Sequence, residues 1–271
     1  MAFFDAGDAA IYYEITGEGE PLMLLHGYAL NSLMWEMQIP ALAEKYQVIT
    51  VDLRGFGQSS CGKSWSGNAM ADDISGLVKH LDLKSCTMLG FSLSGAIAFR
   101  IAYFHPDRIA RLIMVSASLP SSGAPRKRAE SLAQKRELDI LMARGVDGWA
   151  DKAGFRSGPL VGNIFKRNPE AEPIWERILK RHNPEFLRQM MEARANSSPS
   201  ENWRDKLAEI TQPTLIVAGG QDKRFIDASH YFQRKIPNAQ LQTISGAGHM
   251  LNLEKPEEFN RVVLEFLESY E

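Results

Sequence analysis

Residues 86–102 read CTMLGFSLSGAIAFRIA, an apolar strand-like run followed by a turn of small residues and an apolar helix-like run. In the turn, Ser92 stands between Gly90 and Ser94, which is the small-x-Ser-x-small pattern of a nucleophile elbow. Such a turn needs small neighbours and lifts its central hydroxyl above the sheet at a helix N-terminus, where developing negative charge is favoured. The stretch therefore indicates a serine nucleophile and acyl transfer.

Two downstream segments supply partners for this serine, whose hydroxyl is a weak nucleophile until a base takes its proton and a third group orients that base. The apolar run 213–218 is followed by glycines and then Asp222, and the strand-like run 239–244 leads through a glycine-rich turn to His249. Because the carboxyl ends of parallel strands meet at one edge of a sheet, we expect Ser92, Asp222 and His249 to converge there. Their order along the chain is typical of such sites.

Five segments, taken in chain order, resemble the α/β-hydrolase superfamily. They are LHGY at 25–28, DLRGFGQS at 52–59, the turn around Ser92, GQD at 220–222, and GAGH at 246–249 followed by EKP at 254–256. The chain looks most similar to the branch of small carboxylesterases, enol-lactonases and cofactor-free perhydrolases. The resemblance implies an α/β fold with a mostly parallel central sheet, helices on both faces and a helical cap insertion.

The alternation of apolar runs agrees with this architecture. Residues 2–16 are predicted to form a hairpin around Gly7, and residues 70–81 have helical periodicity. Strand-like runs lie at 21–25, 46–53, 86–89, 111–116, 213–218 and 241–244. Apolar runs separated by helices favour a parallel sheet covered on both faces. The segment 120–208 breaks this alternation, so we expect a core formed by 1–119 and 209–271, with 120–208 as the helical cap that the resemblance implies.

The expected reaction has two steps. Ser92 attacks the carbonyl of a small-molecule ester or lactone while His249 takes its proton and Asp222 holds the imidazole, which leaves an acyl group on the serine. The resemblance assigns the oxyanion donors to the backbone N–H groups of Tyr28 and Leu93. Relatives that act as dehalogenases or epoxide hydrolases carry Asp at the elbow, so Ser92 argues against both. No cofactor and no metal ion are expected.

Several alternatives stay open at this point. Residues 92–96 also fit the elbow pattern, which would make Ser94 the nucleophile. Asp222 could cap the next helix, although no carboxylate directly follows the strand-like run that ends at Ser116 to take its place. The same residues would serve a C–C bond hydrolase, a thioesterase, a perhydrolase or an acyltransferase, or a ligand receptor with little turnover.

Composition narrows the class of protein. The chain has 271 residues, 44% of them hydrophobic, and a net charge of -2, which gives no electrostatic reason to expect a nucleic-acid partner. The N-terminus lacks the pattern of a secretory signal, and no run is long and apolar enough to span a membrane, so we expect a cytoplasmic protein. Cys61 and Cys86 lack metal-site spacing and are interpreted as reduced and structural. Whether the chain forms a homo-oligomer stays open.

Overall fold

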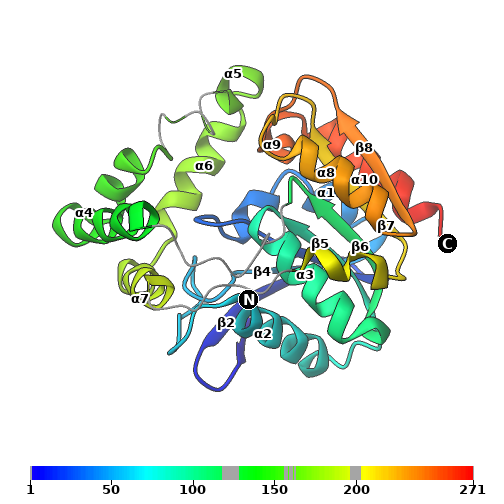
Figure 1. Cartoon of the computed structure of the whole chain (residues 1–271), viewed down its shortest axis with the longest axis horizontal. Coiled ribbons are helices and arrows are strands. Elements are labelled where there is room, and N and C mark those ends of the chain that lie inside the picture. The colour runs from blue at the N-terminus through cyan, green and yellow to red at the C-terminus, as the bar shows by residue number, and fades with distance from the viewer. Residues whose placement is uncertain are drawn as a thin grey trace.

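The computed structural model describes residues 2–117, 128–155, 158, 161, 163–195 and 203–270. One eight-stranded sheet, with strand order β1-β2-β4-β3-β5-β6-β7-β8, runs through these residues (Figure 1). Its strands are β1 (Ala2–Asp5), β2 (Ala10–Thr16), β3 (Glu20–Leu25), β4 (Tyr46–Val51), β5 (Cys86–Phe91), β6 (Ile109–Val115), β7 (Thr214–Gly219) and β8 (Ala239–Ile244). β2 pairs antiparallel with β1 and β4, and the other neighbours are parallel. The mostly parallel sheet and the N-terminal hairpin are therefore confirmed.

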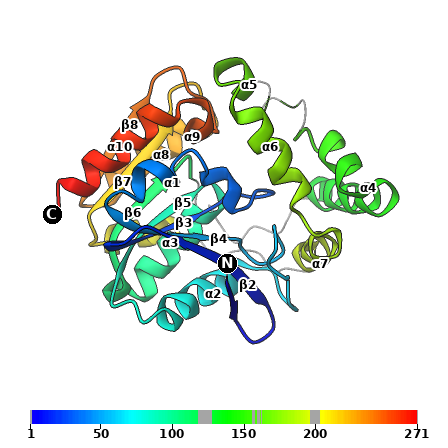
Figure 2. The ribbon, with the colours of Figure 1, turned by 180° about the vertical axis from the view of Figure 1, so that it is seen from behind.

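Helices cover both faces of this sheet. The α-helices outside the 120–208 segment are α1 (Ile39–Leu42), α2 (Gly67–His80), α3 (Leu93–Phe104), α8 (Ile226–Lys235), α9 (Leu251–Glu254) and α10 (Pro256–Glu268). The described part of the chain also has three short 3-10 helices, η1 (Ser32–Trp35), η2 (Pro106–Arg108) and η3 (Arg204–Glu209). α2, α3 and α8 lie on one face and α1 and α10 on the other, as the two opposite views show (Figures 1 and 2). This is the arrangement that right-handed crossovers produce.

The central strands are apolar because water reaches neither face. All described side chains of β5 and β7 are buried, and residues 22–25 of β3 have no exposed surface. Strands buried on both faces appear in sequence as continuous apolar runs, which is why they could be predicted. The edge strand β8 instead alternates between partly buried and exposed positions.

Several predicted boundaries move by a few residues, and two of these shifts have a clear local reason. The helix expected at 70–81 begins earlier because Ser66 caps it, its hydroxyl accepting from the Ala69 N–H at 3.1 Å. The strand expected at 46–53 ends at Val51, since the Leu53 N–H donates to the His26 ring at 2.8 Å rather than to a neighbouring strand.

Among the described residues between β6 and β7, four α-helices precede η3 and stand to one side of the sheet in both views (Figures 1 and 2). These inserted helices are α4 (Arg128–Lys152), α5 (Ile164–Arg167), α6 (Ala171–Lys180) and α7 (Pro184–Ala195). α4 is interrupted at Gly145, whose φ is 66°. α5 contacts α9 and α6 contacts η1, so both of these inserted helices meet the core. The boundary expected at 119/120 falls outside the described residues, and the division into core and cap stays a prediction.

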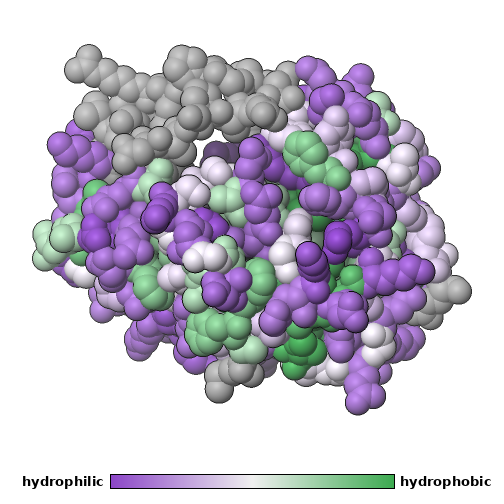
Figure 3. Space-filling model, turned by 90° about the horizontal axis from the view of Figure 1, so that it is seen from below, coloured by the Kyte–Doolittle hydropathy of each residue, from purple (hydrophilic) through white to green (hydrophobic). Residues whose placement is uncertain are grey.

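The surface is mixed in character. Hydrophilic residues predominate on the face shown in Figure 3, and hydrophobic residues form small separate groups there. Within the described parts of the chain, no helix combines the length and the apolar composition that a membrane crossing requires.

Candidate active site

Ser92 occupies a sharp turn between β5 and α3. Its backbone has φ 53° and ψ -104°, a conformation that residues other than glycine rarely adopt. The turn leaves no room for larger neighbours: a Cβ on Gly90 would lie 2.4 Å from the Ser94 carbonyl oxygen, and one on Gly95 would lie 2.3 Å from the Ala117 Cβ. Small residues are therefore required on both sides of Ser92, and the partly exposed serine stands where the strand meets the helix.

Three side chains from different elements meet at this turn. His249, which follows β8, places Nε2 3.2 Å from the Ser92 hydroxyl oxygen, and its Nδ1 lies 2.7 Å from Oδ2 of Asp222, which follows β7. An ionised carboxylate can only accept, so Nδ1 carries the hydrogen and Nε2 is left to accept from Ser92. The Asp222 side chain is 6% exposed and that of His249 10%. The sequence expectation that these three residues converge at one edge of the sheet agrees with this geometry.

Ser94, the alternative nucleophile, faces into the protein. Its buried hydroxyl accepts from the Phe91 N–H at 2.8 Å and donates to the Leu25 carbonyl oxygen at 2.6 Å. The first bond closes the elbow on itself, and the second ties it to the neighbouring strand β3. Of the two serines, Ser92 is the one whose hydroxyl lies within hydrogen-bond distance of His249.

The two expected oxyanion donors belong to the start of α3 and to the turn after β3. Leu93 is the first residue of α3, and the first N–H groups of a helix have no acceptor within it. Tyr28 lies in a tight turn after β3 that is closed by the Leu30 N–H donating to the Gly27 carbonyl at 3.3 Å. A Cβ on Gly27 would lie 2.8 Å from the Phe91 ring, so this turn packs directly against the elbow strand.

His26 holds the base of the Tyr28 turn. Its Nε2 accepts from the Leu53 N–H at 2.8 Å, so its Nδ1 carries the hydrogen and donates to the Gly27 carbonyl at 2.7 Å. The ring is fully buried, and this burial lowers the pKa of His26 from 6.5 to about 4. A neutral imidazole with both nitrogens bonded is structural.

His182 supports the same turn from the inserted helices. Its Nδ1 accepts from the Gly57 N–H at 3.0 Å, and its Nε2 donates to the Ala29 carbonyl at 3.2 Å. Burial lowers the pKa of His182 to about 4. No sequence pattern around His182 signals this role, because its partners lie in two distant loops.

The two cysteine thiols take no part in this chemistry. Cys61 and Cys86 are buried and unbridged, and burial raises their thiol pKa values to about 11 and about 12. Neutral thiols of this kind are poor nucleophiles. Over the described ranges, no group of three or more His, Cys, Asp or Glu side chains is placed to hold a metal ion.

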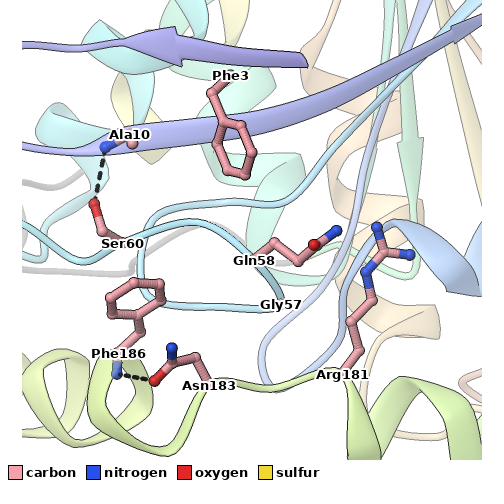
Figure 4. Close-up of a pocket in the computed structure, with 8 residues that line it drawn as sticks. All are labelled: Phe3, Ala10, Gly57, Gln58, Ser60, Arg181, Asn183 and Phe186. Atoms are coloured by element: carbon pink, nitrogen blue, oxygen red, sulfur yellow. Dashed lines mark hydrogen bonds between the residues drawn. The ribbon is translucent and has the colours of Figure 1, made fainter. Parts of the chain in front are cut away.

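A pocket of about 500 Å³ opens between the hairpin, the loop after β4 and the inserted helices (Figure 4). It is lined by Phe3, Ala10, Gly57, Gln58, Ser60, Arg181, Asn183 and Phe186, and none of the three residues at the elbow contributes to it. The Arg181 guanidinium lies 3.8 Å from carboxylate oxygens of Glu14 and Asp52 and over the Tyr12 ring. The cation that lines this pocket therefore already has anionic partners.

Comparison with known proteins places these features in a family context. A family model described as the alpha/beta hydrolase family matches residues 22–262. The AB hydrolase superfamily protein YisY of Bacillus subtilis is 30% identical over 96% of each chain. The solved structure of a thermophilic esterase from Thermogutta terrifontis is 28% identical, with a TM-score of 0.78 over 96% of this chain and 94% of that one. A bromoperoxidase from Bacillus anthracis is 28% identical, with a TM-score of 0.76 over 98% and 99%.

Proposed function

Because the chain belongs to the alpha/beta hydrolase family, we propose that it is a serine hydrolase that cleaves a carboxylic ester or lactone through an acyl-enzyme intermediate on Ser92. The observation that carries this proposal is the hydrogen-bonded chain Ser92–His249–Asp222, with separations of 3.2 Å and 2.7 Å. A hydroxyl, a base and an orienting carboxylate in this relation activate a nucleophile. The similarity to a solved esterase supports the same class of substrate.

In the acylation step, the Ser92 oxygen attacks the substrate carbonyl carbon while its proton passes to His249 Nε2. Asp222 accepts the hydrogen bond from Nδ1 and stabilises the imidazolium that forms. When the tetrahedral intermediate collapses, the bond between the carbonyl carbon and the leaving oxygen breaks, and His249 gives its proton to that oxygen. An alcohol departs and the acyl group stays on Ser92.

In the deacylation step, His249 takes a proton from water, and the resulting hydroxide attacks the acyl carbon. The second tetrahedral intermediate expels the Ser92 oxygen, which regains its proton from His249 Nε2, and a carboxylic acid leaves. In both steps the oxyanion binds the backbone N–H groups of Tyr28 and Leu93. Each such donor contributes about 10²- to 10³-fold in rate.

Hydrolysis of p-nitrophenyl esters from acetate to decanoate tests the proposal. Wild type should turn over at least one ester and be labelled covalently by a fluorophosphonate, whereas Ser92→Ala should lose both properties. Retained turnover or labelling in Ser92→Ala would overturn the assignment of the nucleophile. A wild type that neither hydrolyses esters or lactones nor reacts with the fluorophosphonate would overturn the proposed class.

A perhydrolase is the second candidate, which the similarity to a bromoperoxidase favours. In that reaction hydrogen peroxide replaces water as the attacking group, so the acyl group leaves Ser92 as a peracid and the serine regains its proton. The acid and peracid formed at a fixed peroxide concentration distinguish the two. A product dominated by peracid would make the protein a perhydrolase, and a product dominated by acid would make it a hydrolase.

A further inference from the structure

One cation of the inserted helices contacts two segments near the candidate site, one beside Asp222 and one beyond His249. Arg167, at the end of α5, donates from Nη1 to the carboxylate of Glu254 and from Nη2 to the side-chain oxygen of Gln221. Gln221 directly precedes Asp222, and Glu254 lies in α9, just beyond His249. A single guanidinium therefore joins the loop after β7, which carries Asp222, to the segment after β8, which carries His249. These two segments are called the Asp222 loop and the His249 loop below.

Glu254 also binds the backbone of Gly248, the residue before His249. Its side chain is 1% exposed, and its Oε2 accepts both from Arg167 and from the Gly248 N–H, the latter at 2.7 Å. A buried carboxylate without a cation is strongly destabilised, so the ion pair keeps Glu254 in this place. The backbone beside His249 is consequently held through Glu254 by Arg167.

Backbone hydrogen bonds also join the two loops directly. The Gln221 N–H donates to the Ala247 carbonyl at 2.8 Å, and the Gly220 N–H donates to the Ile244 carbonyl at 2.9 Å. Together with the Arg167 fork, these bonds close a ring that contains both loops. Asn168 adds a second tie from the inserted helices, since its amide donates to the Leu253 carbonyl at 2.8 Å.

We propose that Arg167 is a positioning residue that sets the separation of the Asp222 and His249 loops. Through it the inserted helices help to align the side chains of Asp222 and His249 with Ser92. The proposal rests on the proposed function, because it assigns a purpose to the same three residues. Arginine suits this position since its planar fork binds two acceptors at once, whereas lysine presents a single point charge. Docking of α5 against α9 thereby becomes a condition of full activity.

The test compares Arg167→Gln and Arg167→Lys with Arg177→Gln. Arg177 is a matched control because it also joins an inserted helix to the core, binding both carboxylate oxygens of Glu36 at 2.7 and 2.6 Å, but lies on α6 away from both loops. Loop misplacement should lower kcat and the rate of fluorophosphonate labelling about 10- to 100-fold in Arg167→Gln, with KM changed by less than about threefold. Arg167→Lys should recover part of this loss, and Arg177→Gln should keep both rates within about twofold.

Unchanged kcat and labelling in Arg167→Gln would overturn the proposal, even if the melting temperature fell, since that is the behaviour of a merely structural contact. Should Arg167→Gln fail to fold, Gln221→Met removes one arm of the fork and should still lower kcat by several fold. Amide hydrogen exchange reports positioning without any reaction: exchange at Gly248 should rise in Arg167→Gln and not in Arg177→Gln. Wild type without activity would therefore overturn the proposed function, while equal exchange would overturn this inference.

Discussion

The Phe225 ring stacks on the imidazole of His249, with centroids 4.5 Å apart and an interplanar angle of 27°. Phe225 is buried just before α8, and the Phe91 ring lies 5.1 Å from the imidazole. Two hydrogen bonds fix the ends of the imidazole, and these two aromatic contacts restrict its rotation.

Loss of the stacking between Phe225 and His249 should lower kcat by more than the accompanying loss of stability explains. Aromatic pairs contribute about 0.5–1.5 kcal/mol, so Phe225→Ala should lower kcat about two- to tenfold by letting the imidazole leave its reactive orientation. The control is Phe232→Leu, a buried residue of α8 whose ring neighbours Tyr231. It should lower the melting temperature with kcat unchanged. Equal kcat in Phe225→Ala and wild type would contradict the prediction.

A methyl group at Gly219 should displace the histidine loop. A Cβ there would lie 2.1 Å from the Gly248 carbonyl oxygen and 2.6 Å from that of Ala247. Gly219→Ala should therefore lower kcat about 10- to 100-fold in steady-state ester hydrolysis. The adjacent Gly220→Ala is the control, because its nearest neighbour would be the Ile244 carbonyl at an ordinary 3.4 Å. Similar rates in the two variants would show that the loop does not depend on this close approach.

Ser94→Ala should separate folding from chemistry. The variant loses two buried hydrogen bonds and leaves the Phe91 N–H unpaired, so the free energy of unfolding in urea should fall by about 1–3 kcal/mol. Covalent labelling and kcat should stay within about fivefold of wild type, because the Ser92–His249 contact does not involve this hydroxyl. If labelling vanished in Ser94→Ala while Ser92→Ala kept it, Ser94 would be the nucleophile.

The buried ion pair between Arg54 and Asp73 should be a major support of the loop after β4. Its two hydrogen bonds are 2.6 Å long, and both side chains are 4% exposed. Asp73→Ala leaves a buried guanidinium without this partner and should reduce the free energy of unfolding by about 3–5 kcal/mol. The exposed pair Arg261–Glu265 provides the control, since Glu265→Ala should change it by less than about 0.5 kcal/mol.

Acid should destabilise the fold through its two buried histidines. The folded-state pKa values of His26 and His182 are about 4, below the ordinary 6.5 of the unfolded chain. Above pH 6.5 both states are neutral. Between pH 6.5 and 4 only the unfolded chain binds the protons, so stability falls by about 3 kcal/mol per histidine as the pH drops.

Urea unfolding across this pH range measures the effect. His182→Gln keeps a donor for the Ala29 carbonyl but removes one titrating group, so it should lose about 3 kcal/mol less than wild type between pH 6.5 and 4. The same pH dependence in variant and wild type would show that His182 is accessible to protons in the folded state.

The parts of the site on strand ends could be predicted from the sequence. Ser92 and Asp222 each follow an apolar run and His249 follows a strand-like one, and such runs mark parallel strands whose ends meet at one edge. The N-terminal hairpin could also be predicted from a local pattern, the strand-like residues on both sides of the turn at Gly7. In these places the local sequence pattern is enough to predict where the residues lie in the fold.

The supporting polar residues could not be predicted from any local pattern. Arg167 ends α5 and His182 lies between α6 and α7, in stretches that show only ordinary charged and polar positions, and their partners lie in distant loops. Glu254 was part of a family-like segment, but nothing in that segment indicated that its carboxylate bonds to the Gly248 N–H. Contacts of this kind depend on how the inserted helices dock, which hydrophobic periodicity does not describe.

The left-handed backbone of Ser92 has an evolutionary consequence. Residues held in such conformations cost about 1–3 kcal/mol, and a glycine would relieve most of that cost. Random mutation therefore finds a more stable protein one substitution away, at the position of the proposed nucleophile. Purifying selection has to oppose that substitution for as long as the hydroxyl is needed, and a lineage released from this demand should drift toward a more robust but inert scaffold.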